Sequence, residues 1–231
     1  MLSSYHRSPN ALVVGSSGGI GAAFADHLEA AGAAVHRASR SGPIRIDYDE
    51  PETIETALAG IDTLDLVVVA TGLLHGEDKG PEKSTRALDA DWMLRNYRIN
   101  TVGPMLVARH ALPKMRRDAK TVFAALSARV GSISDNRLGG WHSYRMAKAA
   151  LNMGLRNLAI EHARRWPSGL VVGLHPGTVD TGLSKPFQGN VADGKLFDAD
   201  WAAGEMLRVL DGLGPEATGR VFDYAGERVP E

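Results

Sequence analysis

Residues 15–21 read Gly-Ser-Ser-Gly-Gly-Ile-Gly and lie between an apolar run of strand length, residues 11–14, and a helix-periodic segment that extends to residue 31. A pyrophosphate needs backbone N–H groups and the positive end of a helix, and side chains at the turn would block its approach. Gly15, Gly19 and Gly21 meet this need, because a strand precedes them and a helix follows. The alternative is a flexible turn, since a chain with 26 glycines can cluster them by chance.

Strand-like and helix-like segments alternate outward from this turn. Apolar runs rich in Val, Ile and Leu occur at residues 11–14, 33–36, 64–70, 121–126 and 170–174. Helix-periodic segments occur at residues 19–31, 52–59, 91–115, 143–166 and 198–210. Such alternation is typical of a parallel sheet with helices on both faces. The sequence therefore predicts a doubly wound α/β fold, in which ligands bind at the carboxyl ends of the strands.

The composition indicates a single globular domain over residues 1–231. Hydrophobic residues make up 44% and charged residues 23% of the chain, and no repeat or low-complexity linker divides it. The 26 Lys and Arg nearly balance the 27 Asp and Glu, so we expect no nucleic-acid partner. The longest apolar run, residues 66–74, is far shorter than the ~20 residues of a membrane span. The start of the chain lacks an apolar stretch behind a basic patch, so we expect a cytoplasmic protein without a membrane partner.

The residue types present also limit the chemistry. The chain has no cysteine, which excludes disulfides, thiolate metal sites and a cysteine nucleophile. Its eight histidines are scattered without the spacing of metal ligands. We therefore expect no metal.

The end of the second apolar run bears on which dinucleotide the turn would bind. An acidic residue there would hold a ribose 2′-hydroxyl, but residues 36–40 read His-Arg-Ala-Ser-Arg. Arg40, alone or with Arg37, can instead form charge-assisted hydrogen bonds to a 2′-phosphate. We expect NADP rather than NAD, unless these arginines are ordinary solvated charges. Asp47 and Tyr48 end the next short apolar run and are expected at the edge of an adenine pocket.

Tyr144 and Lys148 lie four positions apart at the start of the segment 143–166, and so share one helix face. An ammonium beside the phenol favours the phenolate, so we expect the pKa of Tyr144 to fall from about 10 toward neutrality. Such a phenol is suited to general acid catalysis. This spacing is common by chance, so its weight comes from its position downstream of the glycine turn.

Over nearly its whole length the chain resembles the classical short-chain dehydrogenase/reductase family, a family with a Rossmann-like fold. The matching positions are the glycines Gly15, Gly19 and Gly21, the helix asparagine Asn100, the catalytic pair Tyr144 and Lys148, and the late Pro-Gly-Thr-Val-Asp-Thr segment at residues 176–181. Within the family, residues 127–133 and 175–191 resemble the C-factor-type branch. That branch contains proteins regarded as carbonyl reductases and a bacterial signalling protein.

The resemblance implies hydride transfer between a nicotinamide and a carbonyl carbon, with Tyr144 protonating the oxygen. Lys148 would also bind the nicotinamide ribose, and Asn100 would hold a water that links Lys148 to solvent. Further implied cofactor contacts are Ser17, Ile20, Ala70, Thr71, Gly72, Pro176, Gly177, Val179 and Thr181. The expected function is an NADP(H)-dependent reductase of a small-molecule ketone or aldehyde, or a dehydrogenase of the corresponding alcohol. By analogy we also expect a homodimer or homotetramer, paired through the helices that start near Asp91 and Ser143.

Two positions depart from the family pattern. Ala128 stands where the catalytic serine is usual, with Ser127 one residue before it and Ser132 four residues after it. Neighbouring strand residues point to opposite faces, so a one-residue offset matters unless the strand ends or bulges there. We favour Ser127, although loop rearrangement could bring either hydroxyl to the site. At the end of the fourth strand Ala70 replaces an asparagine, which indicates a different local hydrogen-bond arrangement.

These departures leave a second function open. The protein could bind the cofactor as a signalling or scaffold protein of the C-factor type, with little or no turnover.

Residues 182–196 lack a regular period, so they form either a lid over the substrate or a plain surface loop. The single aromatic residues Tyr97, Trp141 and His142 could form a substrate wall, although single aromatics more often serve in ordinary packing.

Overall fold

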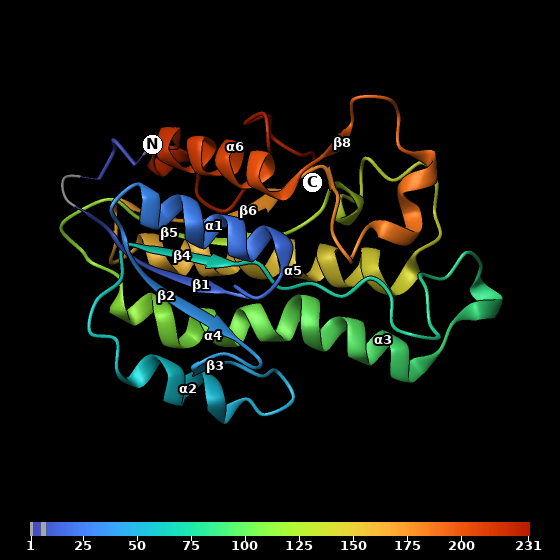
Figure 1. Ribbon diagram of the computed structural model, residues 1–231, viewed down its shortest axis with the longest axis horizontal. Helices are drawn as coiled ribbons and strands as arrows, with labels where there is room; N and C mark the ends of the chain where they lie inside the picture. Colours follow the sequence, from blue (N-terminus) through green and yellow to red (C-terminus); the bar gives the residue numbers. More distant parts are fainter. Residues whose placement is uncertain (1, 6–7) are drawn as a thin grey trace.

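The computed structural model describes residues 2–5 and 8–231, and within them one sheet of seven parallel strands runs in the order β3-β2-β1-β4-β5-β6-β9 (Figure 1). The strands are β1 (Asn10–Val14), β2 (Ala34–Ser39), β3 (Ile44–Arg45), β4 (Leu66–Val69), β5 (Thr121–Leu126), β6 (Gly169–His175) and β9 (Val221–Asp223). The winding direction reverses between β1 and β4, which places a crevice at their carboxyl ends. The predicted doubly wound parallel sheet is confirmed.

Helices cover both faces of this sheet. Figure 1 shows α1 (Gly19–Ala30) and α6 (Ala199–Gly212) on one side and α2 (Glu52–Ala59) and α4 (Gly103–Ala111) on the other. The long helix α5 (His142–Ala163) shares the second face with α2 and α4. Among the helices that the structure describes, none combines the length and the apolar character needed to span a membrane.

Alternation along the strands produces two cores. In β1, Ala11 and Val13 pack toward α1 and α6, whereas Leu12 and Val14 pack toward α2, α4 and α5. Because both faces are covered, the central strands are apolar at almost every position. This pattern explains why the strands are recognisable as continuous hydrophobic runs in the sequence.

The segment predicted as one helix over residues 91–115 is broken in the structure. It consists of α3 (Ala90–Tyr97), a π-helical stretch (Arg98–Val102), α4 and a short 3-10 helix (Leu112–Lys114). Asn100 lies in the π-helical stretch, and its amide both donates to the Leu73 carbonyl oxygen (2.8 Å) and accepts from the Leu73 N–H (3.1 Å). The irregular turn thus accompanies a tertiary contact with the loop after β4, as π-bulges often do at functional sites.

The remaining differences concern short or shifted elements. The strand expected at residues 33–36 is β2, which continues to Ser39. The two-residue strands β3, β7 (Thr178–Val179) and β8 (Leu196–Phe197) are too short to show a period in the sequence. The register of the sheet sets Val14 beside Ala38 and Val69, so the loops that follow β1, β2 and β4 emerge side by side.

Candidate functional site

Two neighbouring cavities open at the carboxyl ends of the strands. The first, of 310 Å³, lies at the ends of β1, β2 and β4 and is called the β1–β4 cavity. Its lining includes the predicted residues Gly15, Ser17, Arg40, Asp47, Tyr48, Ala70, Thr71 and Gly72. The second, of 210 Å³, lies at the ends of β5 and β6 and is called the β5–β6 cavity. Its lining includes the predicted residues Ile20, Ser127, Tyr144, Pro176, Gly177, Val179 and Thr181.

The glycine turn separates the two cavities and is packed very tightly. Gly15 has a left-handed backbone (φ +88°), and a Cβ on Gly21 would lie 2.2 Å from the Gly15 carbonyl oxygen. A Cβ on Gly19 would lie 3.0 Å from Cγ2 of Thr181. Within the described residues no side chain caps the start of α1, and its first turn has no acidic residue. The positive end of α1 is therefore suited to an anion, which fits the pyrophosphate of a dinucleotide.

The two arginines after β2 have different surroundings. Arg40 is exposed, lines the β1–β4 cavity and forms no ion pair within the described residues. The Arg37 guanidinium pairs instead with Asp26 (2.5 Å) and Glu29 (2.8 Å) of α1. Within the described residues, Arg40 is therefore a cation of this cavity that forms no ion pair, and Arg37 belongs to the surface of α1.

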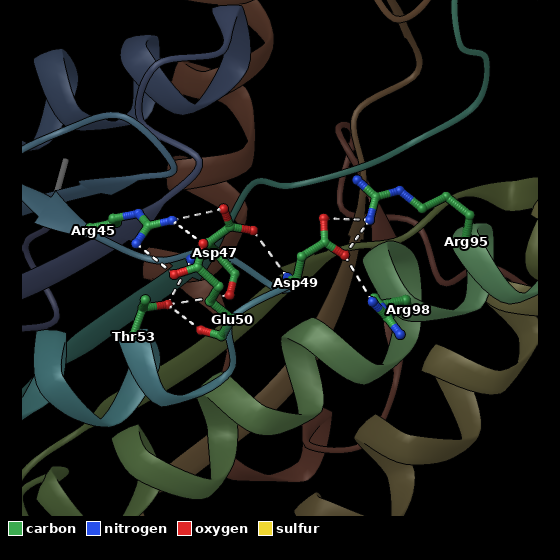
Figure 2. Close-up of polar contacts among 7 residues, drawn as sticks. All are labelled: Arg45, Asp47, Asp49, Glu50, Thr53, Arg95 and Arg98. Carbon is green, nitrogen blue, oxygen red and sulfur yellow. Dashed lines mark hydrogen bonds and ion pairs between the residues drawn. The ribbon is translucent and has the colours of Figure 1, made fainter.

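An ion-pair network supports the outer wall of the β1–β4 cavity (Figure 2). The Asp49 carboxylate accepts from Arg95 (2.5 and 2.6 Å) and Arg98 (2.9 Å), and these hydrogen bonds lower its pKa. The Asp49 N–H donates to Asp47 (3.0 Å), whose side chain also pairs with Arg45 (3.3 Å). Asp49 and Arg95 line this cavity but had no motif in the sequence, because residues far apart along the chain form the contact.

Tyr48 lines the same cavity and is buried. Its hydroxyl lies 3.0 Å from the Thr71 Oγ1, and its ring packs on α4, where a Cβ on Gly103 would lie 2.3 Å from the ring. Burial raises the pKa of Tyr48. The phenol therefore fixes Thr71, and through it the loop after β4.

Tyr144 and Lys148 are both buried in the first turns of α5. The Lys148 Nζ donates to the Leu126 carbonyl oxygen (2.7 Å) and lies 5.7 Å from the centroid of the Tyr144 ring. Burial raises the pKa of Tyr144 and lowers the pKa of Lys148 to about 7. The expectation of a lowered tyrosine pKa is wrong for the polypeptide itself, because desolvation disfavours both charged forms.

Only one of the two candidate serines reaches the β5–β6 cavity. Ser127 lines it and donates its hydroxyl to Oδ1 of Asn152 (2.5 Å). The Ser132 hydroxyl instead accepts from the Asp135 N–H (3.1 Å) and donates to the Glu231 carbonyl oxygen (3.4 Å). Ala128 packs in a small apolar cluster with Tyr144 and Leu74. Because β5 ends at Leu126, strict strand alternation no longer governs Ser127.

Asn100 holds the loop after β4 through the main chain of Leu73. Besides its bonds to Leu73, its amide donates to the Asn96 side chain (3.3 Å), and its residue is fully buried. The loop lies close against Asn100, since a Cβ on Gly72 of this loop would lie 3.6 Å from Asn100 Oδ1. The water link to Lys148 stays a prediction.

An aromatic wall closes the outer side of the β5–β6 cavity. The Trp141 ring lies 6.5 Å from the Tyr144 ring and 5.3 Å from the Phe187 ring, centroid to centroid. Leu183 and Phe187 come from the segment 182–196, so part of this segment lines the cavity. Trp141 thus packs against Tyr144 and also lines the cavity, so the structure leaves both interpretations of this residue open.

The burial of Lys148 predicts a pH dependence of stability. Its pKa lies below the unfolded value of 10.5, so above pH 7 the unfolded chain binds a proton that the folded chain releases. The free energy of unfolding should therefore rise with pH between 7 and 10.5, by up to about 1.4 kcal/mol per pH unit. Urea unfolding of Lys148→Met at pH 7.5, 8.5 and 9.5 should show this slope reduced. The exposed-site control Lys195→Met should keep it, and equal slopes in the two variants would contradict the prediction.

Comparison with known proteins agrees with this architecture. A family model described as enoyl-(acyl carrier protein) reductase matches residues 44–210. The chain is 43% identical to C-signal of Myxococcus xanthus over 145 residues, which cover 62% of this chain and 81% of that protein. It is 32% identical to 1-hydroxy-2-glutathionyl-2-methyl-3-butene dehydrogenase of Rhodococcus sp. (strain AD45) over 179 residues, 76% of this chain and 74% of that one. The fold is also similar to that of NADPH-bound carbonyl reductase from chicken fatty liver, with a TM-score of 0.83 and 24% identity over 97% of this chain and 100% of the other. The chain belongs to the short-chain dehydrogenase/reductase family of oxidoreductases.

Proposed function

We propose that the protein is an NADP(H)-dependent oxidoreductase that reduces a ketone or aldehyde, or oxidises the corresponding alcohol, with Tyr144 as general acid and base. The observation that carries the proposal is the position of Tyr144 in a cavity adjacent to the glycine turn, at the same edge of the sheet. Membership in an oxidoreductase family supports the reaction class. A dinucleotide is proposed to span both cavities across residues 15–21.

The residues present fit such a cofactor. The uncapped start of α1 would take the pyrophosphate, Arg40 a 2′-phosphate, and the segment 176–181 with Lys148 the nicotinamide end. When bound, NADPH supplies the hydride that adds to the carbonyl carbon. The structural relative from chicken is described as NADPH-bound, which agrees with this choice of cofactor.

The chain supplies the proton. Burial raises the pKa of Tyr144, so its phenol keeps a proton to donate at neutral pH. Burial lowers the pKa of Lys148 to about 7, so its amine can gain or lose a proton near neutral pH. Lys148 can therefore return a proton to Tyr144 after the phenol has donated its own. Ser127 would donate to the same substrate oxygen if its hydroxyl turned away from Asn152, since Ala128 has no donor.

The cavity beside Tyr144 favours an uncharged substrate. Its wall is largely apolar and aromatic, with Leu74, Trp141 and Phe187 facing Tyr144. The cation at its rim, Arg129, already pairs with Asp135 (3.2 Å) and Asp223 (3.4 Å). We therefore propose carbonyl compounds with apolar or aromatic substituents as the substrate class.

We also propose that two subunits pair through α3 and α5. Met146, Met153 and Ile160 follow one another at seven-residue spacing along α5 and are each about half exposed or more, and Leu94 and Tyr97 are exposed on the adjoining α3. An exposed apolar row of this kind indicates an interface.

Light scattering after size-exclusion chromatography tests the pairing. Met153→Glu places a charge in the row and should shift the protein from dimer or tetramer to monomer. Leu138→Glu is the matched control, because Leu138 is 91% exposed and lies outside the row. A monomeric wild-type protein would contradict the proposal.

Removal of the Tyr144 hydroxyl tests the catalytic proposal. Tyr144→Phe should lower kcat for NADPH-dependent reduction of aryl ketones, aldehydes or quinones at least 100-fold, because the proton donor is lost, while NADPH still binds. Nicotinamide absorbance measures the turnover and NADPH fluorescence the binding. Tyr5→Phe is the control, since its hydroxyl is buried without a partner among the described residues and lies outside both cavities.

The second candidate function is a signalling or scaffold role, favoured by the identity to C-signal and by Ala128 at the family's serine position. Wild-type protein that binds NADP yet turns over no carbonyl in the panel would favour this role.

Turnover that is equal in wild type and Tyr144→Phe would exclude Tyr144 as the acid.

Arg40 should determine the preference for NADP. Arg40→Ala removes from the β1–β4 cavity a cation that has no ion-pair partner among the described residues, so the Kd for NADP should rise about 10- to 100-fold while the Kd for NAD changes little. Calorimetric titration with both dinucleotides measures this. Arg37→Ala should leave both affinities unchanged because Arg37 pairs with Asp26 and Glu29, and equal wild-type affinity for NADP and NAD would contradict the proposal.

A further inference from the structure

Glu82 is a buried carboxylate outside both cavities. It lies in the loop between β4 and α3, is 3% exposed, and makes contacts at the start of α5, 61 residues away. Its carboxylate accepts from the Ser143 N–H (3.1 Å) and from the Ser143 hydroxyl. Its carbonyl oxygen accepts from the Trp141 N–H (2.5 Å). One residue thus binds the two residues that flank the first position of α5.

The chain enters α5 through an unusual backbone. Gly139, Gly140 and Trp141 are all left-handed, with φ of 62°, 65° and 52°. This conformation is unfavourable for a residue with a side chain, so Trp141 needs contacts that hold it there. Trp141 is the N-cap residue of α5, and within the described residues its side chain makes no capping hydrogen bond. The first turn of α5 also has no acidic residue. Glu82 provides both the acceptor and the negative charge that the start of a helix favours.

The anchored residues are those next to the proposed chemistry. Tyr144 directly follows Ser143, and the Trp141 ring packs against both Tyr144 and Phe187. A shift of the first turn of α5 would therefore move the phenol and the aromatic wall together. Small misplacements of a catalytic group can lower rates strongly.

We propose that Glu82 is a positioning residue that fixes the first turn of α5 and thereby places the Tyr144 hydroxyl and the Trp141 wall. Its carboxylate acts through Ser143, whereas its main-chain carbonyl oxygen binds the Trp141 N–H, a contact that substitutions of the Glu82 side chain keep. Its catalytic consequence rests on the proposed carbonyl reduction at Tyr144, whereas its effect on α5 is independent of any activity.

The test compares Glu82→Ala, Glu82→Gln and Ser143→Ala with the control Glu77→Gln, which removes an exposed carboxylate from the same loop. Steady-state kinetics give kcat and the KM for NADPH, and amide hydrogen exchange reports on residues 141–146. Glu82→Ala should lower kcat at least tenfold, leave the KM for NADPH within twofold, and speed exchange only at the start of α5. Glu82→Gln should recover part of kcat, because its amide oxygen can still accept from the Ser143 N–H. Glu77→Gln should match wild type.

The effects of Ser143→Ala and Glu82→Ala on kcat should not be additive. Ser143→Ala should lower kcat less than Glu82→Ala, and the double variant should lose no more than Glu82→Ala alone, because both changes remove one shared interaction. Should Glu82→Ala fail to fold, Glu82→Gln and Ser143→Ala decide the question by the same readouts.

Unchanged kcat in a folded Glu82→Ala, or faster exchange spread over the whole molecule, would overturn the positioning role. Wild-type protein without turnover would count against the proposed function only. Exchange at residues 141–146 would then still decide whether Glu82 holds the start of α5.

Discussion

The close approach of the chain to itself at residues 15–21 is the constraint on which the site depends. A Cβ on Gly21 would lie 2.2 Å from the Gly15 carbonyl oxygen, so no side chain fits there, and only residues 15–18 separate the end of β1 from the start of α1. Its positive end therefore faces the same edge of the sheet at which β5 and β6 end. Parallel pairing brings Ser127 and Pro176 to that edge as well, although they are distant in the sequence. The two cavities are consequences of this single arrangement of strands.

Burial, rather than the charge of a neighbour, determines the protonation of the proposed catalytic groups. Tyr144 packs with Leu74 and Ala128, and Lys148 is buried with its Nζ at the Leu126 carbonyl oxygen, so desolvation raises the pKa of the phenol and lowers that of the amine. The phenol is thereby kept as a proton donor. Arg40 shows the opposite case, because it stays exposed at the cavity where a phosphate can reach it. The same sheet edge thus offers a buried acid in one cavity and an exposed cation in the other.

Local sequence patterns predicted the parts of the molecule that local physics determines. The bounds of β5 (Thr121–Leu126) and α2 (Glu52–Ala59) agree with the predicted runs, and the glycine turn lies where its motif placed it. The break of the 91–115 helix could not be predicted, because Asn100 interacts with Leu73, a residue of another loop. The Glu82 contact with Ser143 and the raised pKa of Tyr144 likewise depend on tertiary packing. Sequence motifs therefore identified candidate site residues. The hydrogen-bond partners of those residues and their burial could be known only from the fold.

The most direct measurement is an amide-resolved NMR titration of the ¹⁵N-labelled wild-type protein with NADPH. We expect the amides of the turn 15–21 and those of Ala128 and Tyr144 to change together, with a single Kd, because one dinucleotide spans both cavities. Changes confined to other parts of the molecule, or a turn that responds without Ala128 and Tyr144, would contradict a nicotinamide site beside the buried phenol.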